Sequence, residues 1–363
     1  MHRAHKIKLQ PTKAQEQYFV RACGTARFAF NWALAEWQKE YEAGGKPSEA
    51  ALRKKLNSIK ATEFPWMAEV TKCAPQQAIK NVGTAFQNFF RRTKQGGKPG
   101  YPKFKRKGQH DSFRADNGPA DANSHAVECI GKTIKLPRCG AVKMREALRF
   151  TGRTLSATVS KQADGWYVTL LVDTADIMSG PLGGGTVGVD LGLKNLAVLS
   201  TGEVLPPLKP HRALHSRLVR LSRSLSRKKK GSSNRAKAKT KLAKLHKRIA
   251  DIRVDALHKL THRLATEFDT IAIEDLNVKG MVRNSHLARS VSDVGFGEFR
   301  RQLEYKAAMT GTSVFIVDRF YPSSKTCSTC GEIHEMKLSN RVMVCGCGNV
   351  MDRDLNAAIN LKN

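Results

Sequence analysis

Three carboxylates in the second half of the chain stand where an apolar segment meets a turn. Asp190 ends the run VGVD, Glu274 ends IAIE, and Asp354 begins the terminal segment DLNAAINLK. A carboxylate at the mouth of a buried element is costly to ionise, and three that converge cannot all remain ionised without cations. Two divalent ions about 3.5–4 Å apart would meet this need and would clamp the attacking and leaving oxygens of a phosphodiester displacement. Hard carboxylate oxygens favour Mg²⁺ or Mn²⁺.

Each acid also has a simpler interpretation. Asp190, followed by Leu-Gly, could be a turn residue, and Glu274 with Asp275 could form a helix N-cap pair. Asp354 could be only the N-cap of the terminal helix, and Asp352 is a rival for the third carboxylate. Taken together, the order strand-Asp, strand-Glu, helix-Asp favours a shared site.

Four of the eight cysteines form a second cluster near the C-terminus. Two residues separate Cys327 from Cys330, and one residue separates Cys345 from Cys347. Close pairs in a chain without an export signal indicate metal ligands rather than disulfides, so we expect one structural Zn²⁺ with four thiolate ligands. The second pair is tighter than a usual zinc knuckle, and His334 is a possible substitute ligand. We expect the scattered cysteines, Cys23, Cys73, Cys129 and Cys139, to be small core residues.

The hydrophobic pattern predicts the elements that must position these residues. Residues 4–10 alternate polar and apolar side chains as a strand does, whereas 13–42 and 74–92 show helical spacing. Between 127 and 177, short β-branched runs separated by turn residues predict several strands, which suggest a small barrel completed by the first strand. The helices would then be an insertion into this barrel. Gly183-Gly184-Gly185 marks the main domain boundary.

The second half alternates strands and helices. The expected elements are strands within 187–205, a helical hairpin at 211–266, a strand at 270–276, a helix near 294–310, a buried strand at 313–318 and a terminal helix at 354–362. Leucines and isoleucines repeat every three or four residues on both sides of a break at 231–234. We expect this apolar stripe to pack the two arms of the hairpin together.

The charge balance points to a polyanionic partner. Lys and Arg number 63 against 31 Asp and Glu, a formal net charge of +32, and such an excess repels itself unless nucleic acid neutralises it. The hairpin, with Arg227–Lys230 at its tip, is one candidate contact. The loop Arg91–Lys107, with Tyr101 and Phe104 among its cations, is either another contact or a solvated linker. No apolar run approaches the roughly 20 residues of a spanning helix and no signal peptide opens the chain, so we expect a cytoplasmic, nucleoid-associated protein without membrane contact.

Several motifs resemble the TnpB family of insertion-sequence proteins, compact relatives of type V CRISPR effector nucleases. They are GVDLGLKNLAVLS (188–200), IAIEDLNVKGM (271–281), FYPSSKTCSTCG (320–331), CGCGNVMDRDLNAAINL (345–361), TARFAFNWAL (25–34) and GYPKFKRKG (100–108). The resemblance covers nearly the whole chain. The one departure from the family pattern is the short spacing of the second cysteine pair.

The resemblance implies an α/β multidomain protein. It implies an RNase H-like (RuvC-type) nuclease domain at 181–363, with the basic hairpin at 211–266 and a zinc ribbon inserted at 320–350. It also implies a wedge-like β-barrel at 1–12 and 101–180, interrupted by a helical recognition region at 13–100. Its catalytic residues would be Asp190, Glu274 and Asp354, the last preferred to Asp352 because family relatives carry their acid immediately before x-Asn-Ala-Ala.

The resemblance also implies the function and the partners. In that family, an RNA from the transposon end guides the protein to complementary double-stranded DNA, which is cut beside a short flanking motif. We therefore expect a Mg²⁺- or Mn²⁺-dependent, RNA-guided DNA endonuclease. The alternatives are a transposase that joins as well as cuts strands, an RNA-guided DNA-binding repressor without cleavage, and a ribosomal type of zinc-ribbon RNA-binding protein. Loss of the carboxylates would indicate the repressor, and all three are present; the zinc-ribbon protein would not need three carboxylates on buried elements.

Overall fold

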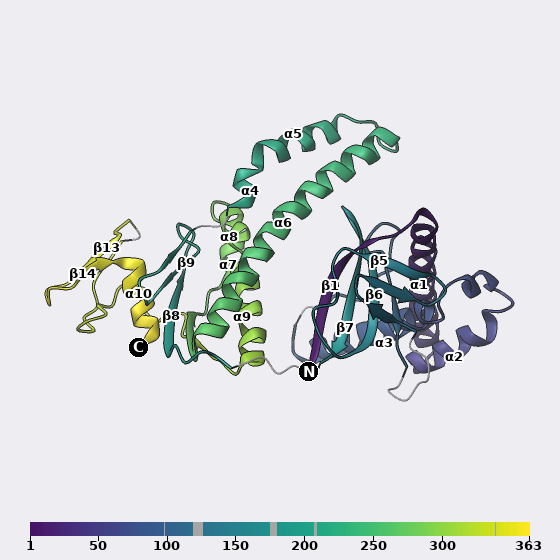
Figure 1. Ribbon diagram of the computed structural model, residues 1–363, viewed down its shortest axis with the longest axis horizontal. Helices are drawn as coiled ribbons and strands as arrows, with labels where there is room; N and C mark the ends of the chain where they lie inside the picture. Colours follow the sequence, from purple (N-terminus) through teal and green to yellow (C-terminus); the bar gives the residue numbers. More distant parts are fainter. Residues whose placement is uncertain (98, 119–125, 175–179, 207–208, 338) are drawn as a thin grey trace. The chain divides into compact units, whose positions relative to one another are not determined.

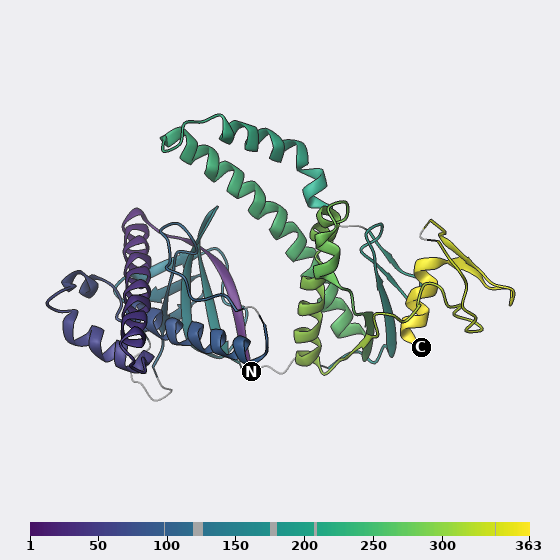
Figure 2. The same ribbon diagram turned by 180° about the vertical axis from the view of Figure 1, so that it is seen from behind.

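The chain forms two compact units. The computed structural model describes residues 1–97, 99–118, 126–174, 180–206, 209–337 and 339–363. The units are Met1–Asp176 and Ile177–Asn363, and Figures 1 and 2 show the elements of each from two sides. The division falls a few residues before the three glycines at 183–185.

The first unit is built on a seven-stranded antiparallel sheet. Its strand order is β2-β6-β7-β1-β5-β4-β3. The bounds are β1 His2–Gln10, β2 Ser112–Asp116, β3 Glu128–Ile130, β4 Thr133–Leu136, β5 Gly140–Met144, β6 Arg153–Gln162 and β7 Gly165–Asp173. All the strands expected from the sequence are present, and β2 is an additional strand that the hydrophobic pattern does not predict. The first strand does join the later ones, pairing with β7 and β5.

One side chain links the two edges of this sheet. Asn117 directly follows β2, and its Nδ2 donates to the carbonyl oxygens of Val127 (2.8 Å) and Thr154 (2.7 Å). Its Oδ1 accepts from the Val127 N–H, directly before β3, at 2.6 Å. These bonds hold the two edge strands close together, but among the described residues no backbone ladder joins β2 to β3, so the closed barrel stays a prediction.

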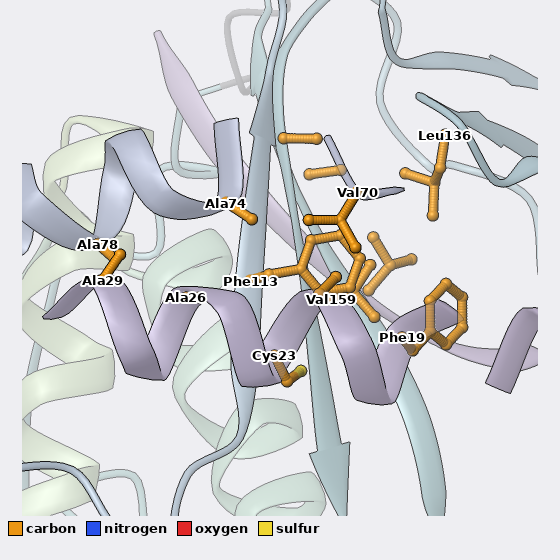
Figure 3. Packing of buried hydrophobic residues seen from close by; sticks show 14 of the residues in the cluster. Phe19, Cys23, Ala26, Ala29, Val70, Ala74, Ala78, Phe113, Leu136 and Val159 are labelled. Atoms are coloured by element: carbon orange, nitrogen blue, oxygen red, sulfur yellow. The ribbon is translucent and has the colours of Figure 1, made fainter. Parts of the chain in front are cut away.

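Helices inserted between β1 and β2 cover the sheet. They are α1 Lys13–Glu42, α2 Glu49–Ile59, the 3-10 helix η1 Pro65–Glu69 and α3 Cys73–Lys94. Thr12 and Gln15 form a capping box that starts α1 directly after the strand. The helices and sheet share one core, in which Phe19, Cys23, Phe113 and Val159 lie together (Figure 3). The sequence pattern does not predict helix α2, because only Leu52 and Leu56 of it are buried, too few to show a periodic stripe.

The second unit contains a mixed five-stranded sheet of order β10-β9-β8-β11-β12. The strands are β8 Thr186–Leu191, β9 Ala197–Leu199, β10 Val204–Leu205, β11 Thr270–Glu274 and β12 Ser313–Val317. Strands β8, β11 and β12 are parallel, whereas β8, β9 and β10 pair in antiparallel fashion. Helices α6 (Ser233–Glu267) and α9 (Phe296–Thr310) cover one face, and the terminal helix α10 (Arg353–Lys362) packs on β8 (Figure 1).

The basic hairpin is made of α4 (Pro210–Ala213), α5 (His215–Ser226) and the first half of α6. The apolar stripe does not pack the two arms along their whole length, which corrects the sequence-based expectation. Leu257, Leu260 and Leu264 are buried in the core of the sheet, and Ile252 is 41% exposed. The reason is length: α6 has 35 residues and α5 has 12, so only part of α6 can face α5.

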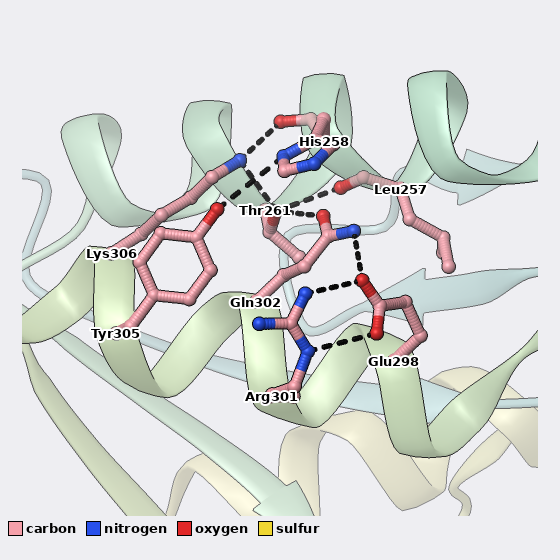
Figure 4. A network of polar contacts seen from close by, with 8 residues as sticks. All are labelled: Leu257, His258, Thr261, Glu298, Arg301, Gln302, Tyr305 and Lys306. Carbon is pink, nitrogen blue, oxygen red and sulfur yellow. Dashed lines mark hydrogen bonds and ion pairs between the residues drawn. The ribbon is translucent and has the colours of Figure 1, made fainter. Parts of the chain in front are cut away.

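A polar network lies between α6 and α9 (Figure 4). The Lys306 Nζ donates to the His258 carbonyl oxygen (2.5 Å) and to the Thr261 Oγ1 (2.8 Å), although Lys306 is only 8% exposed. Gln302 joins Thr261 to Glu298. The network therefore connects the long helix of the hairpin to the helix that covers the sheet.

Strand β12 corrects another expectation. The sequence predicts a buried strand, but Phe315 is 65% exposed and Ile316 is 39% exposed. In the part of the chain that the structure describes, β12 is an edge strand that pairs only with β11, so its outer side chains are uncovered within this unit. Among the described residues, no helix is both long and apolar enough to cross a membrane.

Candidate active site

Asp190 lies on β8, on the face covered by the terminal helix. Side chains alternate between the two faces of a strand, so Asp190 shares its face with Gly188. A Cβ at Gly188 would lie 1.9 Å from the Ala358 carbonyl oxygen, which means that the backbones of β8 and α10 are in direct contact there. Asp190 is therefore a strand residue that pairs with Val198, and the interpretation of a mere turn residue is wrong.

Glu274 ends β11, the strand next to β8. The parallel register pairs Ile273 of β11 with Val189 of β8. The residues that follow them, Glu274 and Asp190, therefore lie side by side on the same face of the sheet. The Oε1 of Glu274 accepts a hydrogen bond from the Ser323 hydroxyl at 2.7 Å. Glu274 does not cap a helix, because the N-cap of the following helix α7 (Val278–Arg283) is Asn277.

Asp354 lies in the first turn of α10. The N-cap of that helix is Asp352, whose Oδ1 accepts from the N–H groups of Asp354 (2.9 Å) and Leu355 (3.2 Å). The capping interpretation of Asp354 is therefore wrong, and the carboxylate of Asp352 is engaged in capping. Asp354 is paired with Arg353, whose Nη2 lies 3.4 Å from its Oδ1.

The charges of these acids interact. Burial, together with the negative charges of Glu274, Asp354 and Asp352, raises the pKa of Asp190 to about 8, against the opposing charge of Arg353. By contrast, hydrogen bonds from Arg300 and Arg319 lower the pKa of Asp275. The structure thus brings Asp190, Glu274 and Asp354 into one electrostatic environment in which negative charge predominates. Asp275 is instead paired with Arg300 and Arg319.

Four thiols gather in the segment between β12 and α10. The Sγ atoms of Cys327 and Cys347 are 3.7 Å apart, those of Cys330 and Cys345 are 3.5 Å apart, and all four lie within 4.8 Å of one another. Four bonds of about 2.3 Å in a tetrahedron place sulfur atoms about 3.8 Å apart, so the cluster could hold a metal ion. The backbone N–H of Cys330 and the side chain of Asn349 lower the pKa of the Cys327 thiol to about 5, which favours a thiolate at that position. Burial and the neighbouring thiols raise the pKa of Cys330 and Cys345 instead, so a metal ion would have to displace the protons from these two.

His334 remains an alternative ligand. Its side chain forms a second compact group with Glu332 and Cys345. Among the described residues, the three acids Asp190, Glu274 and Asp354 do not form so compact a group.

Sequence reasoning missed three polar residues that connect these features: Ser323, Asn356 and Asn360. Asn356 is fully buried and Asn360 is 6% exposed. Their Nδ2 atoms donate to the Thr326 carbonyl oxygen at 2.7 and 2.6 Å, next to the first cysteine ligand. The signal was available, because two asparagines four residues apart on an otherwise apolar helix face must find partners when that face is buried.

The two basic segments differ in their surroundings. Lys228, Lys229 and Lys230 at the tip of the hairpin have no carboxylate within 4.0 Å among the described residues, so they are available for an external anion. In the loop after α3, Tyr101 packs edge-on against Phe86 and Phe89, with ring centroids 5.6 and 5.4 Å away. Tyr101 is therefore packed on α3 and is still 44% exposed, so the two interpretations of this loop stay open.

Family models match three parts of the chain. A model described as "Probable transposase" matches residues 169–285, a Cas12f1-like TNB domain matches 296–361, and a helix-turn-helix domain matches 1–46. In the structure, the last segment forms β1 and the single long helix α1. The TNB match contains the four-cysteine cluster and most of α10.

Similar proteins cover nearly the whole chain. A protein of Streptomyces pristinaespiralis named "Putative RNA-guided DNA endonuclease" is 36% identical over 369 residues, which is 99% of this chain and 88% of the relative. "Putative RNA-guided DNA endonuclease InsQ" of Escherichia coli strain K12 is 34% identical over 379 residues, 99% of this chain and 91% of the relative. Among solved structures, Cas12f1 in a complex with sgRNA and target DNA matches with a TM-score of 0.60 and 14% identity, covering 97% of this chain and 83% of that one. At this identity the match concerns the fold alone.

Proposed function

The chain belongs to the TnpB family of transposon-associated proteins, and on that premise we propose that it is an RNA-guided DNA endonuclease. The observation that carries the proposal is the grouping of Asp190 on β8 with Glu274 on β11 and Asp354 on α10, whose charges act on one another. Nothing in a merely structural role requires three carboxylates to share one site, since their repulsion destabilises the fold.

The proposed catalytic residues are Asp190, Glu274 and Asp354. The donor set fits divalent ions, because hard oxygen ligands with excess negative charge are what Mg²⁺ and Mn²⁺ bind. Asp190, Glu274 and Asp354, whose charges interact, would together hold these ions. When bound, the two ions would activate water and stabilise the leaving 3′ oxygen of a DNA phosphodiester.

We further propose that the chain's own residues prepare this site before any ion binds. The parallel register of β8 and β11 places Asp190 beside Glu274. Close packing of α10 on β8 brings Asp354 to the same face. The guanidinium of Arg353 partly offsets the negative charge of the three acids, and it would have to move away from Asp354 when divalent ions bind.

Cys327, Cys330, Cys345 and Cys347 are proposed to hold one structural Zn²⁺. A closed four-thiolate site has no open position for substrate, so its contribution would be to fold the ribbon at 320–350 beside α10. The spacing of the four sulfur atoms supports this ligand set.

The proposed partners are a guide RNA from the transposon end and double-stranded target DNA. Base pairing would select the site, the cationic surfaces would hold the backbone of the heteroduplex, and the first unit would read a short flanking motif. In this proposal residues 13–100 form a recognition region inserted into a wedge-like barrel made of 1–12 and 101–180. The net charge of +32 supports binding to two nucleic acids.

The decisive experiment begins with the RNA that co-purifies with the protein. Its sequence defines a complementary plasmid target, which the purified ribonucleoprotein should cut in Mg²⁺ next to a recurring short motif. Asp190→Ala should leave RNA binding intact and abolish cutting. Strand-transfer products would instead support a transposase, and binding without cutting would support a repressor.

A further inference from the structure

Ser323 connects the proposed catalytic acids to the cysteine cluster. It is only 3% exposed, and its hydroxyl donates to the Glu274 Oε1 at 2.7 Å. Its carbonyl oxygen accepts from the Asn360 Nδ2 at 2.8 Å. One residue thus contacts both the acid at the end of β11 and the helix that carries Asp354.

The same helix is bound to the start of the cysteine cluster. Asn356 accepts from the Ser328 N–H at 2.9 Å and donates to the Thr326 carbonyl oxygen at 2.7 Å. These two partners flank Cys327, the most buried of the four thiols. The segment 323–328 is therefore bonded both to Glu274, through Ser323, and to α10, through its two asparagines.

We propose that Ser323 is a positioning residue for Glu274, and that through Ser323, Asn356 and Asn360 the four-cysteine ribbon sets the geometry of the acidic site. This inference rests on the proposed function, because it assumes that Glu274 acts in DNA cleavage. A glutamate at a strand end has several rotamers, and a short hydrogen bond from a buried hydroxyl selects one of them. A residue that only stabilises the fold would not affect how the site binds divalent ions.

The test compares Ser323→Ala, Ser323→Thr and the neighbouring Ser324→Ala in the purified ribonucleoprotein. The side chain of Ser324 makes no hydrogen bond among the described residues, so it is a matched control. We expect Ser323→Ala to lower kcat about tenfold, equivalent to about 1.4 kcal/mol, with KM for the target DNA and the zinc content unchanged. The Mn²⁺ concentration that half-maximally raises the melting temperature of the nucleic-acid-free protein should also rise about tenfold. Ser323→Thr, which keeps the hydroxyl, should restore both values, and Ser324→Ala should change neither.

Two outcomes would overturn the proposal. One is a Ser323→Ala variant that cuts DNA and responds to Mn²⁺ as the wild type does. The other is a loss of activity that parallels a loss of zinc or of folded protein, since this would make Ser323 merely structural. Glu274→Gln distinguishes a failure of the proposed function from a failure of the positioning role. If Glu274→Gln still cuts DNA, the proposed function itself is wrong. If Glu274→Gln is inactive but Ser323→Ala is unimpaired, only the positioning role of Ser323 is wrong.

Discussion

Gly188 of β8 lies against the carbonyl oxygen of Ala358 in α10, so closely that a Cβ on Gly188 would be 1.9 Å from it. The added atom would also lie 2.7 Å from the Lys362 backbone nitrogen. Both obstacles are backbone atoms of a helix, which no side-chain rotation can move away. The position of Asp354 relative to Asp190 therefore depends on the absence of a side chain at Gly188.

Gly188→Ala should displace α10 and reduce cleavage by at least tenfold. Forcing a methyl group into a packed contact costs about 1–3 kcal/mol, so the melting temperature should also fall. Gly297→Ala is the matched control, because a Cβ there meets nothing within 4 Å and alanine favours a helix over glycine. Wild-type activity in Gly188→Ala would show that α10 does not need this contact.

Asp190 makes the stability of the metal-free protein depend on pH. Its pKa is raised from 3.8 to about 8 in the folded state. Between these values the folded state binds the proton that the unfolded state has released, so stability falls as pH rises, by up to about 1.4 kcal/mol per pH unit. In buffer without Mg²⁺, and with the zinc of the ribbon retained, the melting temperature should decline from pH 5 to pH 8. Added Mg²⁺ should restore it most at the higher pH, and Asp190→Asn should remove both effects. An unchanged pH profile in Asp190→Asn would contradict the assignment.

The cysteine cluster predicts a metal-dependent ribbon. Cys327→Ser should abolish the binding of one Zn²⁺ per chain, measured by elemental analysis, and should lower both the melting temperature and cleavage. Cys73→Ser, in the first unit, should leave the zinc content unchanged. Measuring the zinc content of His334→Ala decides whether that histidine is a ligand. If the variant retains its zinc, the four cysteines are the ligands.

Much of this arrangement follows from sequence patterns, and the exceptions have physical causes. Long periodic segments such as α1 and α6 are predicted well, because many side chains report on one face. The burial of β12 is predicted wrongly, because an apolar run such as SVFIV does not reveal that its strand lies at the edge of a sheet. The roles of Asp352 and Asp354 could not be separated from the residues alone, because either can start a helix and only the cap hydrogen bonds distinguish them.

The hairpin tip predicts a salt-dependent contribution to nucleic-acid binding. Replacing Lys228, Lys229 and Lys230 by Glu should weaken binding of the guide RNA or of the target and should flatten the dependence of log affinity on log salt. Each phosphate that the protein no longer neutralises reduces the magnitude of that slope by about 0.7–0.9. Replacement by Gln should produce a smaller effect in the same direction, because it removes the charge without adding repulsion. An unchanged slope in the Glu variant would assign these lysines to a solvated surface.

The lowered pKa of Lys306 predicts a second pH dependence of stability, which lies in the alkaline range and is opposite in sign to that of Asp190. Burial lowers its pKa from 10.5 to about 8, and its ammonium donates to neutral oxygens, those of His258 and Thr261 (Figure 4). Between pH 8 and 10.5 the unfolded state holds the proton that the folded state has released, so this group makes stability rise with pH. Lys306→Met, which fills a similar volume without a charge, should abolish that rise and should stabilise the protein near pH 7. If the melting temperature of Lys306→Met is instead lower at neutral pH, the two hydrogen bonds of the ammonium outweigh the cost of burying it, and the connection between α6 and α9 depends on the charged form.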